Sequence, residues 1–378
     1  MNIPEHAAKA LLEDAGIPVP AGTVADSPQG AARAAAAVGP VMVKAQIPAG
    51  GRGKSGGVKP ARNPAAAHAA AEDLLGSRID RHLVTSVLVE ERVPVATELY
   101  AAVLNHPVGP ARRVVLSKRG GVDIEVTART DPGSIRTLDI DPRTELRPEV
   151  ARRFAARTGL DGAAPAVADV LVRMDRLHRD SDAQLLEVNP LAITDAGDVV
   201  ALDCKLVIDG AAAVRRPSLA ALAAPEPLTE LERTAREFGL QFVELDGDVG
   251  VLANGAGLTM TTMDVIVHLG GRPANFLEIG GDAYTKARPA LELVLAQRGL
   301  RSLVVNFCGA FARTDVMVDG LTEAWTELEP DVPAFFTING TGAAEARRML
   351  EERLGLETYP TMDEAITAAI RAVGQDAA

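Results

Sequence analysis

The fold of the second half of the chain is decided at residues 249–257, which read VGVLANGAG. The mostly apolar start of this stretch is typical of a buried strand, and the asparagine and glycines after it are typical of a tight turn that leads into a helix. Four more apolar segments are likewise followed by an expected turn and helix: Ala274–Ile279, Leu303–Phe307, Ala334–Ile338 and Glu357–Tyr359. Repeated strand–turn–helix units predict a parallel, doubly wound sheet and therefore an α/β fold.

The turns after these strands are candidate binding loops, because ligands of doubly wound sheets bind beyond the carboxyl ends of the strands. The loops concerned are Asn254–Gly257, Gly280–Tyr284, Gly309–Phe311 and Asn339–Gly342. Unpaired N–H groups at the start of the following helix suit a carboxylate or a phosphate. Any one loop is well explained as a turn that the fold needs, and this explanation is weaker for the four loops together.

The first half has helix and strand patterns without such a regular repeat. Helical spacing and capping residues predict helices at 4–15, 27–38, 64–76, 148–158 and 163–179. Apolar runs predict strands at 41–47, 85–91, 97–104 and 112–117, and a hairpin of 183–188 with 198–203. Residues 211–227 lack periodicity and are rich in alanine, proline and arginine, as in a link. We therefore expect two domains, residues 1–226 and 227–378.

The composition excludes several classes of protein. The 378 residues carry a formal net charge of −12, opposite in sign to that of a protein that grips nucleic-acid phosphates. Two cysteines do not make a disulfide framework and fit a reducing compartment. The N-terminus has no basic segment before an apolar run, and no uncharged apolar stretch is long enough for a membrane helix. We expect a cytoplasmic protein without nucleic-acid or membrane partners.

A glycine-rich loop at residues 49–57, which reads AGGRGKSGG, is a candidate phosphate cradle. Its glycines let backbone N–H groups approach phosphate oxygens, and Arg52 and Lys54 supply positive charge. The loop is not a Walker A motif, because the first glycine of that motif would fall at Pro48. A surface hairpin is the alternative. Lys44 lies inside the apolar strand just before the loop, where its side chain either points to solvent or reaches a nucleotide phosphate.

Carboxylates and an asparagine near strand ends are candidate ligand contacts. Glu90 ends one expected strand and Glu98 begins another, and glutamates at strand ends are usually only solvated. The alternative for Glu90 is that its carboxylate accepts hydrogen bonds from a ribose or an adenine edge. Glu187 and Asn189 share a strand face, and Asp203 lies on the other arm of the expected hairpin. Asn189 and Asp203 would then meet at one Mg²⁺ ion, which prefers oxygen ligands, or they cap a turn.

These segments, in this order, resemble the beta subunit of succinyl-CoA synthetase (succinate–CoA ligase), from Asn2 to about Gly374. The resemblance rests on six further segments together with the glycine-rich loop: Val43-Lys44, Glu187–Leu191, Leu202–Lys205, Asn254–Leu258, Pro273–Leu277 and Arg313–Asp315. It implies an ATP-grasp domain for the first half of the chain and a flavodoxin-like CoA-ligase domain for the second.

The resemblance also implies roles for individual residues. Positions that match nucleotide contacts of ATP or GTP are Lys44, Gly51, Arg52, Gly53, Glu90, Val93 and Glu98. Asn189 and Asp203 match the Mg²⁺ ligands, and Glu187 matches a glutamate that orients a phosphohistidine. Positions that match contacts of the acid substrate are Asn254, Gly309, Ala310 and Phe311.

The implied reaction is the formation of an acyl-CoA from a small dicarboxylate, with succinate the leading candidate. The acid and the nucleotide give an acyl phosphate, a histidine exchanges the phosphoryl group with the nucleotide, and CoA takes the acyl group. In the family that histidine and most of the CoA site belong to an alpha subunit. The resemblance therefore implies an alpha-type partner chain.

Some residues near the expected acid site depart from the family pattern. Ala310 stands where a second glycine is usual, Phe311 replaces an aliphatic residue, and the segment 280–286 is one residue longer. These departures keep three alternatives open. In the first alternative the acid substrate is malate, itaconate or a natural-product precursor in place of succinate. In the second the chain is a non-catalytic nucleotide sensor. In the third an amine takes the place of CoA as the acceptor of the acyl group. The presence of Lys44, Asn189 and Asp203 argues against a non-catalytic sensor. The presence of the second domain argues against an amine as the acceptor.

Overall fold

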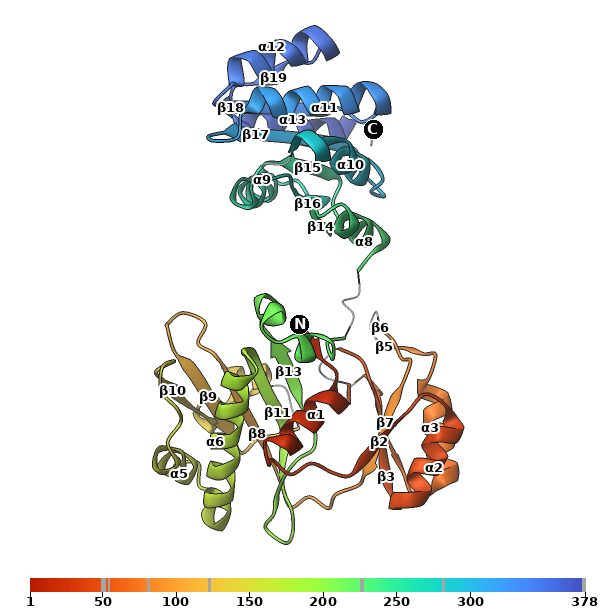
Figure 1. Ribbon diagram of the computed structural model, residues 1–378, viewed down its shortest axis with the longest axis vertical. Coiled ribbons are helices and arrows are strands. Elements are labelled where there is room, and N and C mark those ends of the chain that lie inside the picture. The colour runs from red at the N-terminus through yellow and green to blue at the C-terminus, as the bar shows by residue number, and fades with distance from the viewer. Residues whose placement is uncertain are drawn as a thin grey trace. The chain divides into compact units, whose positions relative to one another are not determined.

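The computed structural model (Figure 1) describes residues 1–48, 52–53, 55–79, 82–121, 124–224, 228–280 and 283–375. The chain forms two compact units, Met1–Pro227 and Leu228–Ala378. Each unit has hydrophobic cores of its own. Among the described residues, no helix is both long enough and apolar enough to cross a membrane.

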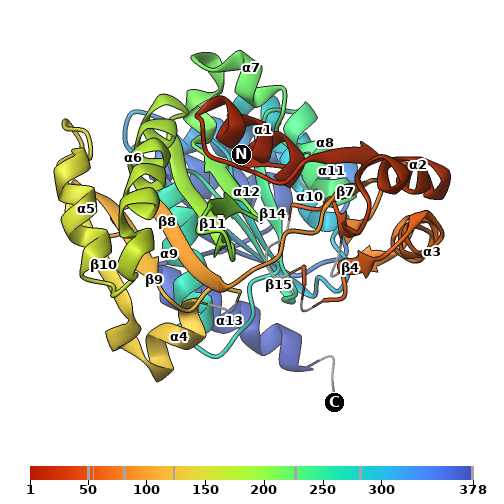
Figure 2. The same ribbon diagram turned by 90° about the horizontal axis from the view of Figure 1, so that it is seen from below.

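The first unit begins with a four-stranded sheet covered by two helices. The strand order is β2 (Gly22–Ala25), β7 (Val87–Glu91), β3 (Val41–Ala45) and β4 (Val58–Ala61), all antiparallel. The helices α2 (Pro28–Val38) and α3 (Pro64–Leu74) pack side by side against it (Figures 1 and 2). Ser27 and Asn63 cap these helices through their side chains, and each is followed by a first-turn proline.

The larger sheet of the first unit has seven strands. Its order is β1 (Asn2–Ile3), β13 (Lys205–Ile208), β11 (Ala183–Ile193), β8 (Thr97–Asn105), β9 (Arg112–Ser117) and β10 (Ile135–Ile140), with β12 (Val199–Ala201) paired to β11. The helices α1 (Glu5–Asp14), α5 (Pro148–Ala156) and α6 (Ala164–Asp180) belong to this layer. Val167, Leu171 and Met174 form one buried face of α6, at the i, i+4, i+7 spacing of an amphipathic helix.

Short elements complete the first unit: β5 (Arg78–Ile79), β6 (His82–Leu83), α4 (Ile124–Thr130) and α7 (Pro217–Ala220). The expected pairing of 183–188 with 198–203 is wrong: residues 183–187 pair with β13, and β12 pairs antiparallel with the later part of β11, residues 191–193. β11 continues through Asn189-Pro190 to Ile193, where the pattern predicted an end at residue 188. The pairing of β11 with β8 shifts register between Val188 and Leu191, so the proline sits in an irregularity that needs no N–H donor.

The second unit confirms the doubly wound sheet. Five parallel strands have the spatial order β16 (Asn275–Glu278), β15 (Val249–Ala253), β17 (Ser302–Gly309), β18 (Ala334–Gly340) and β19 (Thr358–Tyr359). In chain order this is 2-1-3-4-5, the flavodoxin-like arrangement. A sixth strand that the pattern did not predict, β14 (Gln241–Glu244), lies antiparallel to β16 at the edge.

Helices cover both faces of this sheet, as Figure 1 shows. α9 (Ala256–His268) and α13 (Met362–Gln375) pack on the face that carries Val249, Val251 and Val304. The opposite face, with Leu303, Val305 and Phe307, packs against the helices α10 (Ala283–Leu295), α11 (Thr314–Leu328) and α12 (Ala343–Leu354). α8 (Glu230–Glu237) packs beside β14. The alternation of faces along each strand is the period of two that a strand imposes.

Candidate active site

A cavity of about 990 Å³ lies in the first unit and is bordered by residues of both its sheets. Lys44 of β3 and Glu90 of β7 reach it from the four-stranded sheet, and Glu187 and Asn189 of β11 from the larger one. Asp203 reaches it from the segment between β12 and β13, outside the strand in which the pattern placed it. The volume lies at the upper end of the range of small-molecule sites, about 300–1,000 Å³.

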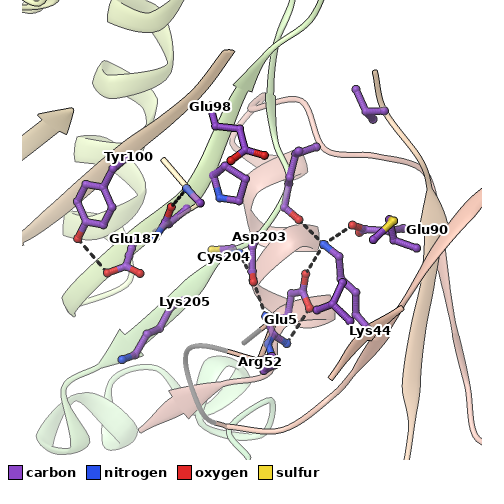
Figure 3. Close-up of a pocket in the computed structure, with 18 of the residues that line it drawn as sticks. Glu5, Lys44, Arg52, Glu90, Glu98, Tyr100, Glu187, Asp203, Cys204 and Lys205 are labelled. Carbon is purple, nitrogen blue, oxygen red and sulfur yellow. Dashed lines mark hydrogen bonds and ion pairs between the residues drawn. The ribbon is translucent and has the colours of Figure 1, made fainter. Parts of the chain in front are cut away.

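Glu5 is the centre of a buried cluster of charged side chains at the floor of this cavity (Figure 3). Its Oε1 lies 3.3 Å from Lys44 Nζ and 3.2 Å from Lys9 Nζ, and its Oε2 lies 2.7 Å from Arg52 Nη1. Glu90 forms ion pairs with both Lys9 and Lys44. Each of these five side chains exposes less than a tenth of its surface.

Asp203 extends the cluster toward the opening of the cavity. Its Oδ1 accepts a hydrogen bond from Arg52 Nη2 and another, at 2.7 Å, from the backbone N–H of Cys204. The carbonyl oxygen of Leu202 accepts from Lys9 Nζ at 2.7 Å and from Lys44 Nζ at 2.5 Å. The cluster therefore contains three cations, Lys9, Lys44 and Arg52, and three carboxylates. The carboxylates are those of Glu5, Glu90 and Asp203, so the side-chain charges balance one another.

The charges of this cluster stabilise one another strongly. Burial alone would raise the pKa of Glu5, but Lys44, Arg52 and Lys9 outweigh it and hold that pKa far below its usual range. Burial alone would lower the pKa of Lys44, but Glu5 and Glu90 raise that pKa well above its usual value. Glu5 and Lys44 are thus both charged at neutral pH, as buried ion pairs require.

Asn189 and Asp203, the expected metal ligands, line the same cavity. Asn189 Oδ1 accepts a hydrogen bond from the backbone N–H of Gly121 at 2.7 Å. In the described part of the chain, the hydrogen bonds of the Asp203 carboxylate all fall on Oδ1, which leaves Oδ2 available to a cation. Among the described residues no group of three His, Cys, Asp or Glu side chains is placed to hold a metal.

This donor set fits Mg²⁺ rather than a transition metal. Mg²⁺ takes one or two protein oxygens and fills its octahedron with phosphate oxygens and water, whereas zinc sites are built from cysteine and histidine. Burial, and then the negative charge of Glu5, raise the pKa of Asp203 above its usual range. A bound divalent cation would favour the ionised form and lower that pKa again.

Glu187, the expected catalytic residue, is held by a tyrosine. The hydroxyl of Tyr100, on the neighbouring strand β8, donates to Glu187 Oε2 at 2.9 Å (Figure 3). Burial raises the pKa of Glu187, and the Tyr100 hydrogen bond opposes that shift. Burial and the adjacent Glu187 charge raise the pKa of Tyr100 far above its usual value, so the phenol stays protonated and donates.

Of the remaining residues for which a nucleotide contact was expected, three line the cavity and one, Gly51, is not described. Gly53, Val93 and Glu98 line the cavity together with Lys44, Arg52 and Glu90. Gly51 lies outside the described residues. The structure thus brings together, in one cavity, all the described residues for which a nucleotide or metal contact was expected.

The expected acid contacts belong to the second unit, at the carboxyl ends of β15 and β17. The side-chain amide of Asn254 donates to the carbonyl oxygen of Cys308 at 3.0 Å and accepts from its N–H at 2.8 Å, which ties the two loops together. A Cβ on Gly309 would lie 2.6 Å from the carbonyl oxygen of Thr341, so only glycine fits there. Ala310 and Phe311 are exposed, and the Phe311 side chain is exposed completely, at 106%.

Glu5, Lys9 and Tyr100 are the residues of this site that sequence reasoning missed. One signal was available for two of them. Glu5 and Lys9 lie at i and i+4, on the same helix face as the buried Leu12, where an apolar pair would be expected. A charged pair on the buried face of an amphipathic helix indicates a buried ion pair. Tyr100 carries no such local signal.

The two units match two family models. Residues 2–193 match the ATP-grasp domain model, and residues 252–372 match the CoA-ligase model. The fold and the site thus define an ATP-grasp protein joined to a CoA-ligase domain.

Relatives of known name share the whole length of the chain. The GDP-forming succinate–CoA ligase subunit beta of Thermus thermophilus is 40% identical over 376 residues, which cover 99% of each chain. The ADP-forming subunit beta of Rubrobacter xylanophilus is also 40% identical, over 99% of this chain and 98% of that one. The chain therefore belongs to the family of succinate–CoA ligase beta subunits.

A solved structure supports the fold. The ATP citrate lyase of Methanothrix soehngenii, solved in complex with citrate and coenzyme A, superposes with a TM-score of 0.73 and covers 98% of this chain and 99% of that chain. Its sequence identity is 19%, so the likeness concerns the fold alone.

Proposed function

We propose that this chain is the nucleotide-binding subunit of an acid–thiol ligase, which uses ATP or GTP to join a small dicarboxylate, succinate first among the candidates, to CoA. The observation that carries the proposal is one cavity lined by Lys44, Arg52, Asn189 and Asp203, in which Arg52 pairs with Asp203. Cations next to a pair of hard oxygen donors are what a magnesium nucleotide requires. The 40% identity to succinate–CoA ligase beta subunits supports the same reaction.

The residues of the cavity would act mainly by position and charge. Lys44 and Arg52 would exchange a carboxylate partner for phosphate oxygens and so balance the charge that develops on them. Asn189 and Asp203 would hold Mg²⁺, which when bound neutralises the phosphates. Glu187, with Tyr100 fixing one oxygen, would accept a hydrogen bond from the group that receives the phosphoryl.

The receiving group would come from a partner chain. No histidine is found among the described residues that line the cavity. We propose that an alpha-type subunit supplies the phosphohistidine and most of the CoA site. The phosphoryl group then passes from the nucleotide to that histidine and on to the acid, and CoA displaces phosphate from the acyl phosphate.

The acid would bind at the loops of the second unit. Glycine is required at position 309, and the loop then presents Ala310 and Phe311 to solvent or to a ligand. The exposed ring of Phe311 favours a second candidate within the same reaction class, an acid with a more apolar body than succinate, such as itaconate.

The test is reconstitution. The purified chain is mixed with its alpha-type partner, CoA, Mg²⁺, ATP or GTP, and a panel of acids that includes succinate, malate and itaconate. Thioester and nucleoside diphosphate are measured. We expect both products in equal amounts with one acid of the panel. No product with any acid, and no phosphorylation of a partner histidine, would refute the proposal.

Asp203→Ala serves as the residue test. We expect this variant to lose Mg²⁺-dependent phosphorylation of the partner and to keep its association with the partner, measured by gel filtration. Normal phosphorylation by the variant would remove Asp203 from the metal site.

A further inference from the structure

Glu5 is a buried carboxylate to which no contact with a ligand has been assigned. It opens α1, and its side chain is only 1% exposed. Besides its ion pairs with Lys9, Lys44 and Arg52, its Oε2 accepts a hydrogen bond from Gln46 Nε2 at 3.1 Å. Both carboxylate oxygens are thus engaged by side chains that come from three different segments of the unit.

The two cations that face the cavity each have two carboxylate partners. Lys44 is shared between Glu5 and Glu90, and Arg52 is shared between Glu5 and Asp203. Glu90 and Asp203 are themselves expected to contact the ligand, Glu90 through the nucleoside and Asp203 through Mg²⁺. When those two carboxylates turn to a ligand, Glu5 is the partner that remains with Lys44 and Arg52.

We infer that Glu5 is a positioning residue, which holds Lys44 and Arg52 in place to receive the phosphates of a magnesium nucleotide. This inference rests on the proposed function. Glu5 sets the separation of the two cations, because one rigid carboxylate group contacts both. Because Glu5 stays paired with Lys44 and Arg52, Glu90 and Asp203 can exchange these cations for the ligand.

Lys9 has the complementary role in the same cluster. It contacts Glu5 and Glu90 and donates to the Leu202 carbonyl oxygen. When Lys44 exchanges Glu90 for a phosphate oxygen, Lys9 still pairs with Glu90, so this carboxylate is not left buried and unpaired. Such an unpaired charge would be strongly destabilising.

Two variants separate position from charge. In Glu5→Gln the neutral amide turns an N–H donor toward one of the two cations, and Lys44 and Arg52 keep only Glu90 and Asp203 as partners. In Glu5→Asp the charge remains but the carboxylate retreats by about 1.5 Å, the length of one C–C bond. The Asp variant keeps the cluster neutral and so guards against a failure of Glu5→Gln to fold. The exposed Glu13 of the same helix supplies a control, Glu13→Gln, with the same loss of charge.

The experiment is calorimetric titration of the full-length chain with the magnesium complex of a non-hydrolysable ATP analogue. We expect Kd to rise about tenfold or more in Glu5→Gln, and by a smaller factor in Glu5→Asp, because charge-assisted hydrogen bonds are lost. Glu13→Gln should bind as the wild type does. Wild-type affinity in both Glu5 variants, or in Glu5→Asp alone, would overturn the positioning role.

Steady-state kinetics of the complex with the partner chain give a second readout. A positioning role raises KM for the nucleotide and leaves KM for the acid and for CoA unchanged. A merely structural defect lowers the active fraction, and so the apparent kcat, without moving KM. If the wild-type chain itself fails to bind the analogue, the proposed function fails. If the wild type binds and both Glu5 variants bind equally well, the proposed function stands and the role of Glu5 is refuted.

Discussion

His178, on the inner face of α6, makes the stability of the first unit depend on pH. His178 is 2% exposed, and among the described residues neither ring nitrogen makes a well-formed hydrogen bond, although the backbone of Gln184 interacts with the ring. Burial, with help from the nearby Arg112, lowers the pKa of His178 from 6.5 to about 4. The imidazole is therefore neutral in the folded protein at neutral pH, and protonating it requires a charge to be buried.

The size of the effect follows from these two pKa values. The pKa of His178 is lower in the folded state than in the unfolded state, so the folded state favours the neutral ring. The contribution of this neutral ring to the unfolding free energy is fully present above the unfolded pKa of 6.5 and is lost as the pH falls toward 4. The difference between the two pKa values corresponds to about 3 kcal/mol of unfolding free energy at the acid limit. Between about pH 7 and about pH 5 the loss is about 2 kcal/mol of unfolding free energy.

Replacing His178 by leucine should remove this acid sensitivity, because leucine has a similar volume and, among the described residues, no well-formed hydrogen bond of the ring nitrogens is lost. Urea unfolding is followed by far-UV circular dichroism across that pH range. The single tryptophan, Trp325, lies in the second unit, so its fluorescence reports a transition that His178→Leu should leave unchanged.

The exposed His268, changed to glutamine, is the matched control. The unfolding free energy of the His268→Gln variant should fall with decreasing pH by the same amount as that of the wild type. If His178→Leu loses as much stability as the wild type does between these pH values, His178 is not the acid-sensitive group.

Three further predictions concern the site and its support. In Tyr100→Phe the hydrogen bond that lowers the pKa of Glu187 is lost, so that pKa rises and the acid limb of the kcat profile should move to higher pH; an unmoved limb would contradict the role of the tyrosine. Phe311→Ile should raise kcat/KM for succinate relative to itaconate by about tenfold, and an unchanged ratio would mean that Phe311 does not select the acid. Asp175→Asn breaks a buried pair with Arg112, with contacts of 2.8 and 3.2 Å, and should cost about 3 kcal/mol or more in urea unfolding. A loss below about 1 kcal/mol would refute that estimate.

The second unit could be predicted almost completely from local patterns. Each of its parallel strands is a short apolar run followed by a glycine-, asparagine- or threonine-bearing turn, and the strand order 2-1-3-4-5 is that of the flavodoxin-like topology that the resemblance implied. β14 escaped prediction because its four residues, Gln241–Glu244, alternate weakly and owe their extended form to pairing with β16. Such long-range pairing leaves little trace in the local sequence.

The site could be predicted only where the resemblance supplied residues far apart in the chain. Lys44 and Glu90 lie on different strands and Asp203 lies between two further strands, and no local pattern brings the three together. The long β11 was mispredicted because proline usually ends a strand; here a register shift removes the need for the N–H of Pro190. The roles of Glu5 and Tyr100 depend on tertiary contacts, which spacing along the chain does not reveal.

The most direct test of the central claim is the transfer of phosphate from nucleotide to the partner chain. The full-length chain, its alpha-type partner, Mg²⁺ and γ-labelled ATP or GTP are mixed without acid or CoA, and the label on each chain is measured before and after acid treatment. We expect an acid-labile label on a histidine of the partner that requires both Mg²⁺ and this chain. A partner that stays unlabelled, or a label carried by this chain instead, would contradict the account.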